Sequence, residues 1–234
     1  MSLQERGNIH KNNERDWRPL NPDHMPSVIA SLKGFAGRMN RGGIAEVYAP
    51  FQREDAGRKE GRFVVTPYWE QWGKWNQATF DVDGRQGRFA ADGTYGFGLG
   101  FHYDGDDQPV WFAITTFILP KRSNPKDVRE DDGPLILQLQ GMSQKGTYMD
   151  EEKRVKAAQV MPTLAWEHAE VALMIAWAKQ VHIPILYSRT AENVQHANAD
   201  RILKDRAIRR YNQTAIDMGF VYNPTYNNFM LRLH

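Results

Sequence analysis

Apolar residues recur with helical spacing in some segments and alternate with polar residues in others, which predicts helices and strands in one chain. The first helical pattern follows Asn21 and Pro22, a favourable N-cap and first helical residue, and we expect it to end at residues 41–43. Its apolar stripe consists of Met25, Val28, Ile29, Leu32, Phe35 and Met39. Residues 1–16 show neither pattern and are predicted to form a polar N-terminal arm.

Strand patterns fill the next part of the chain. The segments FVVTPYW (63–69) and ATFDVDG (78–84), followed by two runs joined by a turn at 104–109, predict an antiparallel meander. In the run 95–103 large apolar side chains alternate with glycines, so one face of the strand is aromatic and the other is bare. Because glycine weakens a strand unless something approaches its backbone closely, we expect a helix, a neighbouring backbone or a ligand on the bare face.

Strand and helix patterns alternate in the second half of the chain. The predicted elements are a strand at 135–140, a charged helix at 150–160, a helix from 162 to 180, a strand at 183–188, a helix at 199–218 and a closing strand pair. The helix that ends near Gln180 is so apolar that we expect it to be buried on more than one face. With no internal repeat, this order indicates one mixed α/β domain over residues 1–234.

The composition mainly excludes certain classes of protein and of functional site. The 234 residues, 41% of them hydrophobic and 25% charged, are typical of a soluble globular protein. No apolar run reaches the roughly 18 to 20 residues that a membrane span needs, and the polar start lacks the apolar centre of a signal peptide, so we expect a cytoplasmic (intracellular) protein without a membrane partner. The chain has no cysteine, which excludes disulfides, thiolate metal sites and cysteine nucleophiles. Its net charge of +2 does not by itself indicate a nucleic-acid partner.

Two short motifs stand near the ends of this order of elements. At the start, Arg18-Pro19-Leu20 is followed by Asp23 and an amphipathic helix, and near the end the last helix closes with Met218-Gly219-Phe220. The motifs and the order of elements resemble the GNAT superfamily of N-acyltransferases over nearly the whole chain. The resemblance implies a mixed, largely antiparallel central sheet flanked by helices. It also implies transfer of an acyl group from acetyl-CoA or another acyl-CoA to an amine.

Under this resemblance, the segment LQLQGMSQKGT (137–147) would bind the cofactor. In the superfamily, backbone N–H groups after the fourth strand hold the pyrophosphate at a helix N-terminus, which requires small residues at fixed spacing. The segment supplies such residues with a different spacing. The residues assigned to cofactor binding are Gln140, Gly141, Ser143, Lys145 and Gly146. The alternative is a structural turn with exposed polar residues.

The resemblance also implies an acid, and the residues at the start of the buried helix themselves suggest a base. The superfamily places a tyrosine one turn before the Gly-Phe exit, where it protonates the leaving thiolate. Ala215 occupies that position here, and Tyr211 lies one turn further upstream on the same stripe, so we expect Tyr211 to be the acid, with a core tyrosine as the alternative. Glu167 or His168 would be the base, or Glu170 one turn on; alternatively, these acids complement the helix dipole.

Three further patterns leave alternatives open. His102 and Asp104 have the spacing of two Fe(II) ligands, but the ending of the chain does not resemble a jelly-roll oxygenase, so no metal site is predicted. Tryptophans at 69, 72 and 75 either pack on the core or form a slot for a flat group. A basic run could meet the phosphates of CoA, a nucleic acid or an acidic partner, or form an exposed helix face; it consists of Arg201, Lys204, Arg206, Arg209 and Arg210.

These observations support three hypotheses of different class. The first is an acyl-CoA-dependent N-acyltransferase, or a divergent relative, that modifies an amine. The second is a non-enzymatic module with the same fold that serves as a structural or interaction part of a larger assembly. The third is an enzyme that modifies a nucleic-acid base, for which the basic run is the support.

Overall fold

The structure of the chain is a computed structural model. It describes residues 25–53, 60–69, 77–82, 85–90, 93–119, 133–141, 151–194 and 201–233. The expected N-terminal arm, the motif at 18–20 and the helix start at Asn21 lie outside these ranges, as do Trp72 and Trp75.

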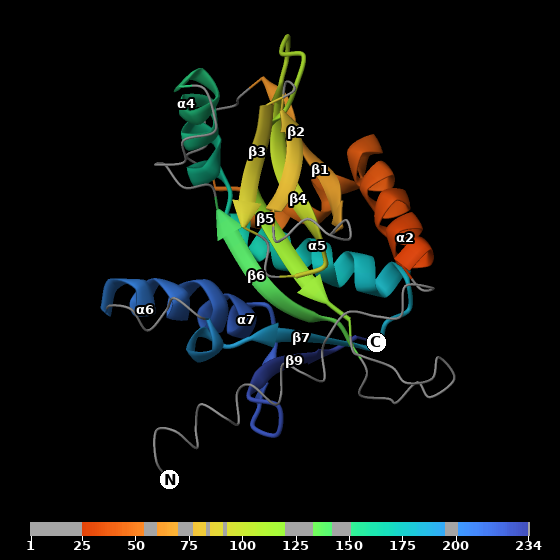
Figure 1. Ribbon diagram of the computed structural model, residues 1–234, viewed down its shortest axis with the longest axis vertical. Coiled ribbons are helices and arrows are strands. Elements are labelled where there is room, and N and C mark those ends of the chain that lie inside the picture. The colour runs from red at the N-terminus through yellow and green to blue at the C-terminus, as the bar shows by residue number, and fades with distance from the viewer. Residues whose placement is uncertain are drawn as a thin grey trace.

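A seven-stranded sheet with the order β1-β4-β5-β6-β7-β9-β8 forms the centre of the molecule (Figure 1). Its strands are β1 (Gly61–Trp69), β4 (Tyr95–Tyr103), β5 (Val110–Ile118), β6 (Leu135–Gly141), β7 (Ile185–Arg189), β8 (Val221–Asn223) and β9 (Asn228–Arg232). Neighbouring strands are antiparallel except β6 and β7, which are parallel. The expected α/β class, with a mixed and largely antiparallel sheet flanked by helices, is confirmed.

The α-helices that the structure describes are α2 (Met25–Arg38), α3 (Ile44–Tyr48), α4 (Glu151–Val160), α5 (Trp166–Gln180), α6 (Arg201–Ala207) and α7 (Thr214–Asp217). The residues Ile208–Gln213 between α6 and α7 form a π-helical turn, called the π turn below. The expected break at 41–43 occurs at Gly42, whose φ of 130° suits glycine, but α3 follows at once and was not expected. In the described part of the chain, no helix combines the length and the apolar character that crossing a bilayer requires.

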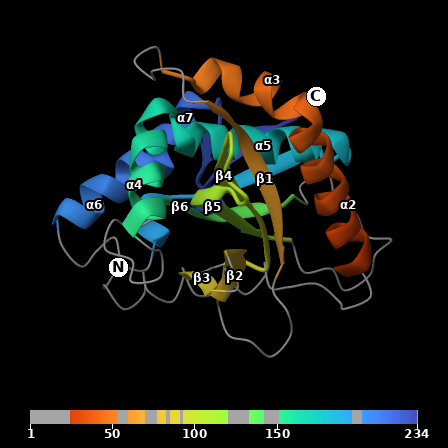
Figure 2. The same ribbon diagram turned by 90° about the horizontal axis from the view of Figure 1, so that it is seen from above.

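Two further strands, β2 (Gln77–Val82) and β3 (Arg85–Ala90), form a separate antiparallel hairpin. Figure 2 shows this hairpin on the face of the sheet opposite to α5. In the main sheet β1 therefore pairs directly with β4, and β2, which contains the described part of the segment 78–84, does not join that sheet. A strand pattern indicates extended backbone but not its partner, which is why the sequence did not distinguish these arrangements.

Helix α5 lies across one face of the sheet and forms the centre of the core (Figure 2). The ring of Trp177 is buried, with its centroid 4.9 Å from that of Phe117 and 6.4 Å from that of Phe97. Its indole N–H donates to the hydroxyl of Ser31 in α2 at 3.2 Å, so the polar atom of this large side chain is satisfied. The expected burial of this helix is confirmed, because most of its apolar residues are buried.

The glycines on the bare face of β4 let its in-sheet neighbour β5 approach closely. A Cβ added at Gly96 would overlap the carbonyl oxygen of Thr115, and one added at Gly100 would lie 2.6 Å from the ring of Trp111. Phe97 and Leu99, on the other face, are buried in the main core. Of the three expected occupants, a neighbouring strand is therefore the one found at Gly96 and Gly100.

Replacing Gly96 with alanine is expected to lower the free energy of unfolding by roughly 1–3 kcal/mol, because the new methyl group must displace the backbone of Thr115. Gly34→Ala is the matched control: Gly34 is an exposed residue of α2 with no atom near its added Cβ, so this change should raise stability by about 0.5–1 kcal/mol. Denaturant unfolding measures both values. A stability of Gly96→Ala equal to that of the wild type would contradict the close approach of β5.

Candidate functional site

The parallel strands β6 and β7 separate soon after they begin. Their register pairs Leu135 with Tyr187 and Ile136 with Ser188, and no pair follows in the described residues. Strand β6 nevertheless continues to Gly141, while the chain after β7 enters a 3₁₀ turn at Ala191–Asn193. Among the described strands, none pairs with the backbone of β6 beyond Ile136 on this side, which leaves a gap between β6 and β7.

Two adjacent side chains of the π turn close this gap. The N–H of Leu139 in β6 donates to the hydroxyl oxygen of Tyr211 at 3.2 Å. The N–H of Ala191, just past β7, donates to the side-chain oxygen of Asn212 at 2.7 Å. Tyr211 and Asn212 thus each satisfy a backbone donor on one side of the gap, where an unpaired buried N–H would cost about 1–3 kcal/mol.

The residue before them, Arg210, connects the π turn to the start of α5. Its guanidinium lies 5.1 Å from the centre of the Trp166 ring, and its Nε lies 3.8 Å from a carboxylate oxygen of Glu167. Three consecutive residues therefore contact α5, β6 and the segment after β7. A π-helical turn inserts an extra residue into a helix, and such turns are frequent at functional sites.

At the end of β6, Gly141 lies beside Trp166. A Cβ added at Gly141 would lie 2.8 Å from the Trp166 ring and 3.0 Å from the methyl group of Met161, so close packing alone accounts for glycine here. The side-chain oxygen of Gln140 accepts a hydrogen bond from Gln138 at 2.6 Å. The other residues expected to bind the cofactor, Ser143, Lys145 and Gly146, lie outside the described residues, so the phosphate cradle stays a prediction.

The two expected bases, Glu167 and His168, have different partners. Glu167 faces Arg210, the residue that precedes Tyr211 in the π turn. The Nε2 of His168 lies 3.0 Å from a carboxylate oxygen of Asp217 in α7, and its ring stacks on Phe51. Hydrogen bonds from Gln213 and from His168 lower the pKa of Asp217, which favours an ionised partner for the imidazole. His168 is therefore held against α7.

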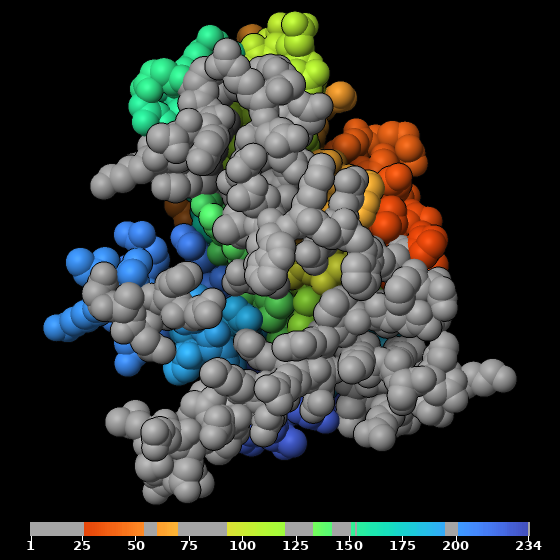
Figure 3. Space-filling view, in the orientation of Figure 1, coloured from red at the N-terminus to blue at the C-terminus, as the bar shows by residue number. Residues whose placement is uncertain are grey.

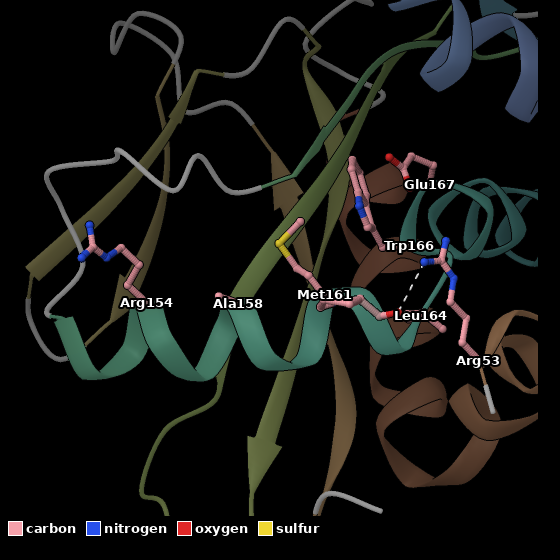
Figure 4. Close-up of a pocket in the computed structure, with 8 residues that line it drawn as sticks. Arg53, Arg154, Ala158, Met161, Leu164, Trp166 and Glu167 are labelled. Carbon is pink, nitrogen blue, oxygen red and sulfur yellow. Dashed lines mark hydrogen bonds between the residues drawn. The ribbon is translucent and has the colours of Figure 1, made fainter. Parts of the chain in front are cut away.

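A pocket of about 340 Å³ lies where α4 meets the start of α5 (Figure 4). The described residues that line it are Arg53, Arg154, Ala158, Met161, Pro162, Leu164, Trp166 and Glu167. A short extended segment fixes one wall: the N–H of Arg53 donates to the carbonyl of Thr163 at 3.0 Å, and the N–H of Ala165 donates to the carbonyl of Phe51 at 2.9 Å. Sequence reasoning missed Arg53 and Arg154, because both lie in charged segments that are typical of solvated surface.

Glu170 is a buried carboxyl group between α5 and α3. Within the described part of the chain, neither of its carboxyl oxygens has a hydrogen-bond partner, and the same is true of the buried hydroxyl of Tyr48. Burial raises the pKa of Glu170 well above its ordinary value. The pKa of Tyr48 is also raised, by burial and then by the nearby charge of Glu170. Glu170 is thus set in the core, and its environment favours the protonated form.

The basic run divides in two. Arg201, Lys204, Arg206 and Arg209 are exposed, whereas Arg210 packs on Trp166. Figure 3 shows α6 (blue) at the edge of the molecule; Arg201, Lys204 and Arg206 belong to this helix, and Arg209 follows it in the π turn.

Two other candidate features are located by the structure. Nε2 of His102 lies 2.7 Å from the carbonyl oxygen of Asp106 at the hairpin turn, and no cluster with the makings of a metal site occurs among the described residues. The ring of Trp69 is partly buried against the core and lies under the ammonium group of Lys33.

The buried carboxyl group predicts a specific pH dependence of stability. The folded state holds the proton of Glu170 more tightly than the unfolded chain, whose glutamate titrates near 4.5. The wild type should therefore lose up to about 1.4 kcal/mol of stability per pH unit as the pH rises from there towards the raised pKa of the folded state. Glu170→Gln should remove this pH-dependent loss of stability. The exposed control Glu192→Gln should retain it. Identical slopes in the wild type and Glu170→Gln, measured by denaturant unfolding between about pH 4.5 and 8, would refute the assignment.

The candidate site thus consists of a gap between two parallel strands, closed by Tyr211 and Asn212, and a neighbouring pocket beside Trp166. Comparison of the chain with models of protein families, with curated proteins and with solved structures finds no match.

Proposed function

We propose that this chain is an acyl-CoA-dependent N-acyltransferase, or a divergent relative of one, that modifies an amine. The observation that carries the proposal is the meeting of the Tyr211 hydroxyl and the Leu139 N–H in the gap between β6 and β7. A proton donor and a backbone hydrogen-bond donor at one point are what acyl transfer from a thioester needs. Tyr211 lies one turn upstream of Ala215, the position at which the resemblance places the acid, and is the residue expected to substitute there.

The residues of the gap fit the reacting end of an acyl-CoA. The N–H of Leu139 is bonded to a side-chain hydroxyl, which can give way to a carbonyl oxygen. Less space is left at the far end of β6, where Trp166 and Met161 pack on Gly141. Under the proposal, Gln140 and Gly141 would hold the phosphates together with Ser143, Lys145 and Gly146.

Acyl-CoA, when bound, supplies a thioester whose carbonyl carbon bonds to the amine nitrogen as its bond to sulfur breaks. The N–H of Leu139 would donate to the carbonyl oxygen as negative charge develops there. Tyr211 would give its hydroxyl proton to the leaving sulfur and regain one from water. Glu167, or His168 through a water, would take the proton that the amine nitrogen loses. The Arg210–Glu167 contact holds this carboxylate beside the helix that carries Tyr211.

A second candidate is a non-enzymatic structural or interaction module with the same fold. Two observations favour it: the close packing of Trp166 and Met161 on Gly141, and a set of exposed apolar side chains in the C-terminal elements. These side chains are Ile202, Ile208, Ile216, Val221 and Tyr222. Modification of a nucleic-acid base is a third candidate, for which the exposed cations of α6 are the support.

Acetyl-CoA is expected to raise the melting temperature of the wild type in a saturable way, because a ligand of the folded state stabilises it. With a panel of amines, release of free CoA thiol should be at least about 10²-fold slower in Tyr211→Phe, while its thermal response to acetyl-CoA persists. Tyr222→Phe is the matched control, since it removes an exposed hydroxyl that bonds Asn227.

Three outcomes would contradict this proposal. The absence of a thermal response to acetyl-CoA would show that acetyl-CoA is not the cofactor. Turnover of Tyr211→Phe equal to that of Tyr222→Phe would show that Tyr211 is not the acid. Recovery of the protein in a stoichiometric assembly, without a response to acetyl-CoA, would favour the interaction module.

A further inference from the structure

The pocket beside Trp166 is lined by two kinds of side chain. Met161, Leu164 and Trp166 provide an apolar wall, together with Pro162 and Ala158. Figure 4 shows Arg154 and Arg53 at opposite ends of the pocket, with Met161 and Trp166 between them. An apolar wall combined with a few placed polar groups is a usual form of a site for a small molecule, and about 340 Å³ lies in the lower part of the usual size range.

The charges around the pocket favour an anion at the Arg53 end. Arg154 pairs with Glu151, and the charge of Glu167 is faced by Arg210. The guanidinium of Arg53 donates to the carbonyl of Pro162 at 3.5 Å, a long contact to a neutral group, and no carboxylate pairs with it among the described residues. The positive charge of Arg53 is thus the one at the pocket that no carboxylate of the described chain balances.

The wall of the pocket is held in place before any ligand arrives. Backbone hydrogen bonds link the segment 51–53 to 163–165, and the ring of Trp166 packs on Gly141 and lies near the guanidinium of Arg210. A preformed site loses little conformational entropy on binding, so modest contacts suffice for measurable affinity.

We propose that this pocket binds a small organic anion: a carboxylate or phosphate group at Arg53, attached to an aromatic or branched aliphatic body that lies against Trp166 and Met161. The inference does not depend on acyl transfer. Among the described residues, those that close the gap, Leu139, Tyr211 and Asn212, do not line the pocket. The size of the pocket limits the ligand to a small molecule or the end group of a larger one.

Calorimetric titration in the absence of acyl-CoA tests the proposal with four probes: 3-phenylpropionate, phenyl phosphate, 3-phenylpropan-1-ol and inorganic phosphate. At least one of the two aromatic anions should bind saturably, and the better of them identifies the acid group. The neutral alcohol and inorganic phosphate should each bind at least roughly tenfold more weakly. The alcohol has no anionic group for Arg53, and inorganic phosphate has no apolar body to lie against Trp166. Since no acyl-CoA is present, failure here is distinguishable from failure of the proposed acyl transfer.

Two pairs of variants locate the binding. Ala158→Phe fills the pocket from an exposed position of α4 and should abolish binding, whereas Gln159→Phe places the same ring at a neighbouring exposed position that does not line the pocket. Arg53→Gln should lower the affinity for the anion by roughly tenfold. Arg62→Gln, which changes an exposed arginine of β1, should leave this affinity unchanged. The proposal is overturned if neither aromatic anion saturates by about 10 mM, if the alcohol binds as well as the anions, or if Ala158→Phe and Arg53→Gln bind like their controls.

Discussion

The separation of β6 from β7 is the constraint on which the rest of the structure depends. In the described chain these two parallel strands pair at two positions, which leaves backbone donors in the interior, and such donors need partners. Tyr211 and Asn212 supply them, one for each side of the gap. The strands can therefore stay apart in a folded core. The Tyr211 hydroxyl reaches the edge of β6 at Leu139, where a paired strand would otherwise lie.

The π turn explains how one short segment reaches three elements. In a regular helix, consecutive side chains point in directions about 100° apart, and the extra residue of a π turn changes this spacing locally. Arg210 can then lie on Trp166 while Tyr211 enters the gap and Asn212 bonds the chain after β7. Trp166 in turn packs on Gly141, so the gap and the pocket share one tightly packed wall.

Much of the fold, but less of the site, follows from the sequence. The aromatic face of β4, the buried helix α5 and the closing strand pair agree with their apolar patterns, because burial on one face leaves a periodic record in the chain. The separate hairpin of β2 and β3 could not be foreseen, since strand partners depend on contacts distant in sequence. No local signal marks a π turn. The contact of Arg53 with the pocket likewise depends on a segment more than a hundred residues away.

Hydrogen exchange at two backbone amides tests the central claim most directly. In the wild type, the amides of Leu139 and Ala191 should both be protected, because Tyr211 and Asn212 accept their hydrogen bonds. In Tyr211→Phe, the Leu139 amide should exchange at least about tenfold faster, while the Ala191 amide, whose partner is intact, keeps its protection. Unchanged protection of Leu139 in Tyr211→Phe would show that the tyrosine does not satisfy the open strand, and would contradict the account.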